Sequence, residues 1–219
     1  FREVEFDGSI KNDADINLVT DDSRLVRPGS LFVCIRHRSF DGHTAAVDAL
    51  ASGAAAVVTQ DRLGLENELR VADSRSAYAR LCAALCNHPE RKLRMIGVTG
   101  TNGKTTTKEL CQAVLSKRYR TIATQGNLNN HIGVPLTLLS MDENTQFGIV
   151  EMGANHPDEI KDLCEIADPD FGLITNIGQA HLEGFGSYEN IVRTKKQLYD
   201  HIFRKSGKVF VHTEDPLLM

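Results

Sequence analysis

The chain has 219 residues, of which 41% are hydrophobic, enough for one large domain or two smaller ones with apolar cores. A formal net charge of −4 argues against a protein that wraps a polyanion, so no nucleic-acid partner is expected. No apolar run approaches the ~18 residues of a membrane span, and the five cysteines lack paired spacing, which favours a reducing compartment.

Short apolar runs alternate with polar turns over the first 92 residues. Strands are predicted at residues 4–6, 16–20, 31–35 and 54–59, and helices at residues 45–51 and 74–86. Asp7 and Gly8 form a predicted turn after the first strand. This pattern indicates a small α/β module. The polar, proline-containing stretch 87–92 then breaks the periodicity, so we predict two domains, residues 1–92 and 93–219.

The following stretch, residues 94–107, reads RMIGVTGTNGKTTT. Its apolar residues 95–98 predict a buried parallel strand, and the apolar residues that follow have helical spacing. A glycine turn between strand and helix lets backbone N–H groups face an anion at the helix N-terminus. The predicted phosphate-binding residues are Gly100, Thr101, Asn102, Gly103, Lys104, Thr105 and Thr106.

Two side chains of this loop have specific expected roles. Lys104 would reach the β- and γ-phosphates of a nucleotide, and the Thr105 hydroxyl would bind Mg²⁺. The match to the usual pattern is incomplete, because Val98 stands where that pattern has its first glycine. An ordinary loop therefore remains an alternative, although the flanking strand and helix argue against it.

Strands and helices continue to alternate up to residue 212. Strands are predicted at residues 119–124, 147–152, 171–177 and 209–212, and helices at residues 135–139, from 157 and at 187–203. Such alternation is typical of a parallel, doubly wound sheet. The predicted fold class is therefore α/β, with a small N-terminal module and a phosphate-binding domain built on a mostly parallel sheet.

Ligands of such sheets bind at the carboxyl ends of the strands, where Thr105, Glu151 and His181 are all expected. Glu151 closes an apolar run, which is costly unless the carboxylate is paired or binds a cation. A hard oxygen ligand beside a nucleotide site suggests Mg²⁺. A hydrogen bond from Glu151 to a loop is the alternative, and a single histidine such as His181 has a structural or a functional role.

The helix expected from Ser187 contains a lysine on its apolar side. At about 100° per residue, Lys195 falls near the centre of the apolar stripe and Lys196 at its edge. The stripe consists of Ile191, Val192, Leu198, Tyr199, Ile202 and Phe203. An inward lysine must extend to solvent, find an anion, lose its proton or be modified. The helical wheel leaves these alternatives open.

Several motifs together resemble the Mur ligases. They are GTNGKTT, the loop GNLNNHIGVP, EMGANH, and HLEGFGS followed by a helical lysine. The N-terminal pattern DSR…PGSLFV…FDGH resembles the uridine-binding domain shared by the third and fourth ligases of that series. The asparagine loop and EMGANH are most similar to those of the last one. The resemblance covers nearly the whole chain.

The resemblance implies a cytoplasmic, monomeric, ATP-dependent amide ligase of peptidoglycan precursor synthesis. Its implied substrates are UDP-MurNAc-tripeptide and D-Ala-D-Ala, joined through an acyl phosphate, with ATP and Mg²⁺ as cofactors and no membrane partner. The implied catalytic residues are Lys104, Glu151, His181 and Lys195. Thr105 and Glu151 would bind one Mg²⁺, and His181 and Lys195 a second, with Lys195 carboxylated by CO₂. The implied substrate-binding residues are Ser23, Arg38, Ser39, Phe40, Asn127, Asn129 and Asn130.

The resemblance further implies the remainder of the central domain and a Rossmann-like third domain, so this chain alone is expected to be inactive as a ligase. One alternative is the preceding ligase, which adds the third residue to UDP-MurNAc-dipeptide. Another is a nucleotide-binding module without ligase activity, against which the intact site residues argue. A folylpolyglutamate synthase would lack the first domain, and nothing else in the chain resembles a P-loop kinase.

Overall fold

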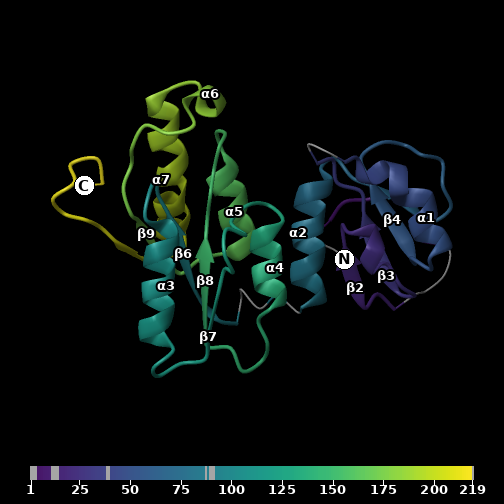
Figure 1. Cartoon of the computed structure of the whole chain (residues 1–219), viewed down its shortest axis with the longest axis horizontal. Coiled ribbons are helices and arrows are strands. Elements are labelled where there is room, and N and C mark those ends of the chain that lie inside the picture. The colour runs from purple at the N-terminus through teal and green to yellow at the C-terminus, as the bar shows by residue number, and fades with distance from the viewer. Residues whose placement is uncertain (1–3, 11–14, 38–39, 87, 89–91, 219) are drawn as a thin grey trace. The chain divides into compact units, whose positions relative to one another are not determined.

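The computed structural model describes residues 4–10, 15–37, 40–86, 88 and 92–218 (Figure 1). The chain divides into two compact units, Phe1–Asn87 and His88–Met219. Each unit contains its own five-stranded sheet. The predicted boundary segment, residues 87–92, lies mostly outside the described residues.

The first unit has the strand order β1-β5-β4-β3-β2. All its pairings are parallel except that of β1 with β5. The strands are β1 (Asp7–Gly8), β2 (Leu18–Thr20), β3 (Ser30–Val33), β4 (Ala56–Thr59) and β5 (Glu68–Arg70), and the helices are η1 (Ser23–Leu25), η2 (Gly42–Ala45), α1 (Ala46–Ala51) and α2 (Ser74–Leu85). Phe32 and Val57 are fully buried in its core, together with Ala46 from α1.

Two elements of this unit differ from the sequence prediction. The strand expected at residues 4–6 is wrong: β1 lies at Asp7–Gly8, where a turn was expected. Both residues of β1 are exposed, so no alternating apolar pattern marks it, and an Arg70–Asp7 ion pair spans its pairing with β5. The sequence prediction also missed β5, because Leu69 is its only buried residue.

The second unit has an all-parallel sheet in the order β10-β9-β6-β8-β7. This arrangement confirms the predicted parallel α/β fold. The strands are β6 (Arg94–Thr99), β7 (Thr121–Ala123), β8 (Phe147–Glu151), β9 (Phe171–Ile174) and β10 (Lys208–Phe210), and the helices are α3 (Lys104–Leu115), α4 (Gly133–Leu139), α5 (Glu159–Ala167), α6 (Leu182–Phe185) and α7 (Tyr188–Arg204).

Helices cover both faces of this second sheet. Helices α4, α5 and α7 pack against one another and against one face, where Met95, Leu163 and Leu198 belong to the main core. Helix α3 packs on the other face, over a smaller cluster around Val98 and Ile149. The central strand β6 therefore leads into the turn that is predicted to bind phosphate. This turn lies at the carboxyl ends of the parallel strands, where ligands bind in this class of fold.

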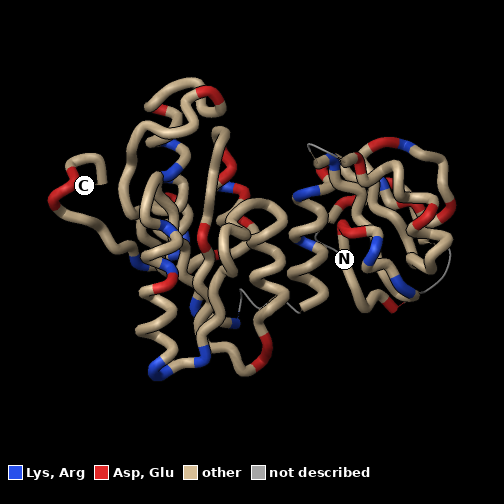
Figure 2. The backbone as a smooth tube through the Cα atoms, viewed as in Figure 1, with Lys and Arg blue, Asp and Glu red and all other residues tan. Residues whose placement is uncertain are grey.

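Basic and acidic residues are mixed along the chain in both units. Figure 2 shows Lys and Arg interspersed with Asp and Glu along the backbone of each. Within the described residues, no helix combines the length and the apolar character that crossing a membrane requires.

Candidate nucleotide and metal site

The turn between β6 and α3 depends on glycine at two positions. Gly100 has φ = 144° and Gly103, which immediately precedes α3, has φ = 78°. A Cβ on Gly100 would lie 1.9 Å from the Oγ1 atom of Thr175, whereas a Cβ on Gly103 would meet no atom within 4 Å. Gly100 is therefore required by both backbone and packing, and Gly103 by backbone conformation alone.

Residues after β9 brace this turn. The Thr101 N–H donates to the carbonyl oxygen of Asn176 (3.0 Å), and the Asn102 N–H donates to the Asn176 side-chain oxygen (3.1 Å). The Thr175 hydroxyl donates to the Asn102 carbonyl at 2.6 Å. The N–H groups of Thr101 and Asn102, both predicted to bind phosphate, therefore hold the turn against Asn176. Thr175 and Asn176 could not be predicted from the sequence, because they are distant from the turn in the chain and meet it only after folding.

Two lysines meet at the carbonyl oxygen of Gly100. Lys104 Nζ donates to it at 3.0 Å, and Lys195 Nζ, from α7, donates to it at 3.1 Å. Lys195 is only 4% exposed, which confirms the inward orientation predicted from the helical wheel. Lys196 points outward and pairs with Asp200.

The environment of Lys195 favours its neutral form. Burial, and then the nearby charge of Lys104, lower the pKa of Lys195 to about 8. Desolvation removes the hydration of an ammonium group, and the neighbouring cation repels it. A lysine in this position is a better nucleophile at neutral pH than an exposed one.

Glu151 ends β8 and is 1% exposed. Its Oε1 atom accepts a hydrogen bond from the Asn129 side chain at 2.7 Å, and its backbone N–H donates to the Thr124 hydroxyl at 3.0 Å. Its Oε2 atom is buried without a partner. The loop hydrogen bond considered as an alternative is therefore present, but it satisfies only one oxygen. An unpaired buried carboxylate oxygen is costly and fits a hard cation such as Mg²⁺.

The other predicted metal ligands are less enclosed. Thr105 is exposed in the first turn of α3, and His181 is exposed with φ = 55° just before α6. Within the described residues, no three His, Cys, Asp or Glu side chains form a cluster that could hold a metal ion. Glu151 would thus share a cation with hydroxyl, water or phosphate oxygens, as is usual for Mg²⁺ beside a nucleotide.

The three loop asparagines lie in different environments. Asn129 faces Glu151, as described above. The Asn130 side-chain oxygen accepts from the N–H groups of Ile132 (3.1 Å) and Gly133 (3.0 Å) at the start of α4. Asn127 is exposed. Two of the three side chains therefore have partners inside the protein, and the substrate contacts expected of the loop remain predictions.

The residues expected to meet uridine lie in the first unit. Ser23 begins η1, which follows Asp22, and Phe40 is 47% exposed. Arg38 and Ser39 lie outside the described residues. Next to this segment, Asp41 accepts from the backbone N–H and the ring Nδ1 of buried His43, at 3.0 and 2.6 Å. His43 Nε2 accepts from the Gln60 N–H at 3.1 Å, so its ring proton sits on Nδ1.

The Asp41–His43 pairing predicts acid sensitivity of the first unit. The His43 backbone N–H, and then its ring, lower the pKa of Asp41 from 3.8 to about 2. Because the folded pKa lies below the unfolded one, the stabilisation is complete above pH 3.8 and is lost as the pH falls towards 2. Asp41→Asn should lack this loss. The stability of the first unit at each pH is measured by unfolding the whole chain in urea and following hydrogen exchange of peptides from that unit. Asp48→Asn, at an exposed position, is the control. Parallel curves for wild type and Asp41→Asn would contradict the prediction.

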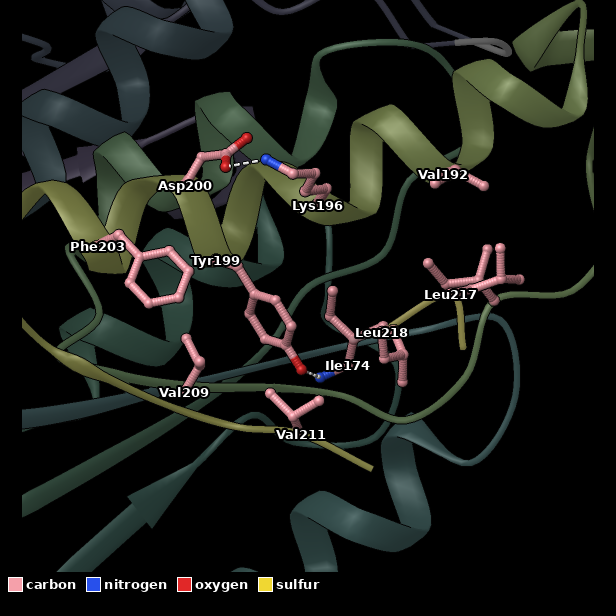
Figure 3. Close-up of a pocket in the computed structure, with 11 residues that line it drawn as sticks. Ile174, Val192, Lys196, Tyr199, Asp200, Phe203, Val209, Val211, Leu217 and Leu218 are labelled. Carbon is pink, nitrogen blue, oxygen red and sulfur yellow. Dashed lines mark hydrogen bonds and ion pairs between the residues drawn. The ribbon is translucent and has the colours of Figure 1, made fainter. Parts of the chain in front are cut away.

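A separate apolar pocket of about 280 Å³ lies beside α7, β9 and β10 (Figure 3). Tyr199 crosses it, accepting from the Ile174 N–H at 3.2 Å and donating to the Phe210 carbonyl at 2.9 Å. Phe203, predicted in the buried stripe of α7, is instead 62% exposed, and it lines the pocket beside Val209 of β10. The residues that line the pocket are Ile174, Ile177, Val192, Lys196, Tyr199, Asp200, Phe203, Val209, Val211, Leu217 and Leu218.

The parallel sheet, the glycine turn opening α3 and the convergent lysines define a P-loop-type α/β protein with a second α/β module. Two family models match it: the Mur ligase middle domain over residues 98–218, and the Mur ligase family catalytic domain over residues 15–95. The chain belongs to the Mur ligase family.

Known proteins resemble the chain over both units. It is 39% identical over 207 residues to UDP-N-acetylmuramoyl-tripeptide–D-alanyl-D-alanine ligase of Bacillus subtilis, covering 93% of this chain and 45% of that protein. The enzyme of the same name from Synechocystis is 41% identical over 215 residues, covering 96% and 47%. The chain thus spans less than half the length of these relatives.

Solved structures agree. A crystal structure of MurF from Acinetobacter baumannii has a TM-score of 0.79 and 35% identity, covering 94% of this chain and 45% of that chain. MurF of Thermotoga maritima in complex with ADP has a TM-score of 0.73 and 33% identity, covering 87% and 44%. The similarity therefore extends to a relative with a bound nucleotide.

Proposed function

We propose that the chain is the N-terminal and middle part of an ATP-dependent ligase that adds D-Ala-D-Ala to UDP-MurNAc-tripeptide. The observation that carries this proposal is the convergence of Lys104 and Lys195 on the Gly100 carbonyl oxygen. Glu151, with its unpaired oxygen, lies on the neighbouring strand, paired with Val98 two residues before Gly100. The names of the relatives and the ADP in one of their structures support the substrates and the nucleotide.

In this proposal, Lys104 and the N-terminus of α3 bind and neutralise the ATP phosphates. The terminal carboxylate of the tripeptide attacks the γ-phosphorus, giving an acyl phosphate and ADP. The amine of D-Ala-D-Ala then attacks the acyl carbon, forms the amide and releases phosphate. Glu151 and Thr105 would hold Mg²⁺, which screens the phosphate charge when bound.

The two remaining residues would complete the cation site. The neutral amine of Lys195 attacks CO₂, forming a carbamate and releasing one proton. The product is an anion in place of a buried cation, and together with His181 it would hold a second Mg²⁺. Burial beside Lys104 supports this step, because it lowers the pKa of the Lys195 amine to about 8. A substantial fraction of the amine is then neutral near physiological pH.

Glu151→Gln tests the metal role in this chain. The substitution keeps the size and the acceptor for Asn129 but removes the negative charge facing the cation. We expect the Mg²⁺ concentration for half-maximal ATP binding to rise by about tenfold or more. Calorimetric titration of ATP at several Mg²⁺ concentrations measures it, with Glu165→Gln on the exposed side of α5 as control. An unchanged Mg²⁺ requirement in Glu151→Gln would contradict the proposed site.

The substrate assignment has its own test in the full-length protein. Turnover with UDP-MurNAc-tripeptide and D-Ala-D-Ala is expected, and turnover with UDP-MurNAc-dipeptide and a single amino acid is not. The reverse result would assign the chain to the preceding ligase. ATP binding without turnover of either precursor would leave a nucleotide-binding module.

A further inference from the structure

Helix α3 contains a fully buried lysine that the proposed mechanism does not use. Lys108, one turn after Lys104, is 0% exposed. Its Nζ atom donates to the Thr124 carbonyl oxygen at 2.6 Å and pairs with the exposed carboxylate of Glu109 at 2.7 Å. Lysine is almost never buried this completely unless its ammonium group has specific partners. The Thr124 carbonyl is the partner that lies inside the protein.

Thr124 connects this lysine to Glu151. The Thr124 N–H donates to the Ile149 carbonyl at 3.0 Å, which extends the β7–β8 pairing by one residue. The Thr124 hydroxyl accepts from the Glu151 N–H at 3.0 Å. Lys108 therefore holds Thr124 in place, and Thr124 in turn holds the backbone of Glu151.

A second contact to Glu151 comes from the same segment. Asn129, five positions after Thr124, donates to Glu151 Oε1 at 2.7 Å, and its carbonyl accepts from the Gly153 N–H at 2.8 Å. A Cβ on Gly153 would lie 2.8 Å from the Asn129 side-chain oxygen, so the segment packs closely on the end of β8. Residues 124–129 thus hold Glu151 at its backbone and at one carboxylate oxygen.

We propose that Lys108 is a positioning residue for Glu151. By anchoring Thr124 to the helix that begins at the phosphate-binding turn, it keeps the unpaired oxygen of Glu151 in a fixed place relative to that turn. The inference rests on the proposed function for the metal role of Glu151. Its structural part, the hold of Lys108 on the backbone of Glu151, stands independently.

Lys108→Met, which keeps the length and removes the donor, tests both parts. We expect hydrogen exchange of the Glu151 and Gly153 amides to accelerate at least about tenfold, while the amides of β6 keep their rates. We further expect the Mg²⁺ concentration for half-maximal ATP binding to rise about tenfold. ATP affinity in EDTA should stay within about twofold, because the Lys108 ammonium group bonds to Thr124 and Glu109, neither of which is a predicted phosphate-binding residue.

Two companion variants separate positioning from a general loss of structure. Glu109→Gln removes the exposed partner of Lys108 but leaves the bond to Thr124, so it should behave as wild type. Thr124→Val keeps the carbonyl that Lys108 binds but removes the hydroxyl that accepts from Glu151. It should produce the same Mg²⁺ shift as Lys108→Met, and the double variant should show no further shift.

The outcomes are distinguishable. Unchanged amide exchange at Glu151 in Lys108→Met, or additive Mg²⁺ shifts in the double variant, would overturn the role of Lys108. If Lys108→Met does not fold, Lys108→Leu, which also lacks a donor, takes its place under the same criteria. Wild-type ATP binding that ignores Mg²⁺ would overturn the proposed function instead, and the exchange rates would still decide whether Lys108 positions Glu151.

Discussion

Gly100→Ala is expected to destabilise the second unit by about 3–5 kcal/mol. An alanine at φ = 144° is strained by about 1–3 kcal/mol, and its Cβ would lie 1.9 Å from the Thr175 hydroxyl, which must move. That hydroxyl donates to the Asn102 carbonyl, so its displacement also loosens the turn that is predicted to bind phosphate. Urea unfolding monitored by circular dichroism measures the change in free energy of unfolding.

Two variants divide this effect into its causes. Gly103→Ala meets no neighbouring atom and should cost only the left-handed backbone strain, about 1–2 kcal/mol. In Thr175→Ala the hydroxyl is gone, so adding Gly100→Ala to it should cost clearly less than in wild type. Equal destabilisation by Gly100→Ala and Gly103→Ala would show that contact with Thr175 contributes nothing.

Lys195→Met is expected to change how stability depends on pH. The pKa of Lys195 is about 8 in the folded chain and 10.5 when unperturbed, so between these values the unfolded state binds more protons. Wild-type stability relative to Lys195→Met should therefore be flat below about pH 8 and rise by about 3 kcal/mol up to pH 10.5.

The measurement is urea unfolding across this pH range in CO₂-free buffer, which keeps the amine unmodified. Lys196→Met is the matched control, because its side chain is on the same helix but exposed. It should show no such rise relative to wild type. If wild type and Lys195→Met run parallel from pH 8 to 10.5, Lys195 carries no depressed pKa and the argument for its reactivity fails.

Sequence periodicity located most of the second unit, because its central strands β6 and β8 are largely buried and helices α5 and α7 bury one apolar side. The inward direction of Lys195 followed from the same reasoning, and the structure showed that its side chain is buried. Prediction failed where burial does not follow local pattern: Phe203 is exposed, and Lys108 is buried among polar neighbours on α3. The position of Lys108 one turn after Lys104 was the only sequence feature that indicated an inward direction, since residues four apart lie on the same face of a helix.

By itself, the sequence determined the glycine turn between β6 and α3, the parallel α/β class, the inward position of Lys195 and the family resemblance. All of these depend on residues close together in the chain or on helical and strand periods. Only the tertiary structure decided that Lys195 reaches Gly100, that Asn129 pairs with Glu151 and that Thr175 forbids a side chain at position 100. These contacts join segments more than twenty residues apart, and their partners are set by strand order and helix packing, which local patterns do not encode.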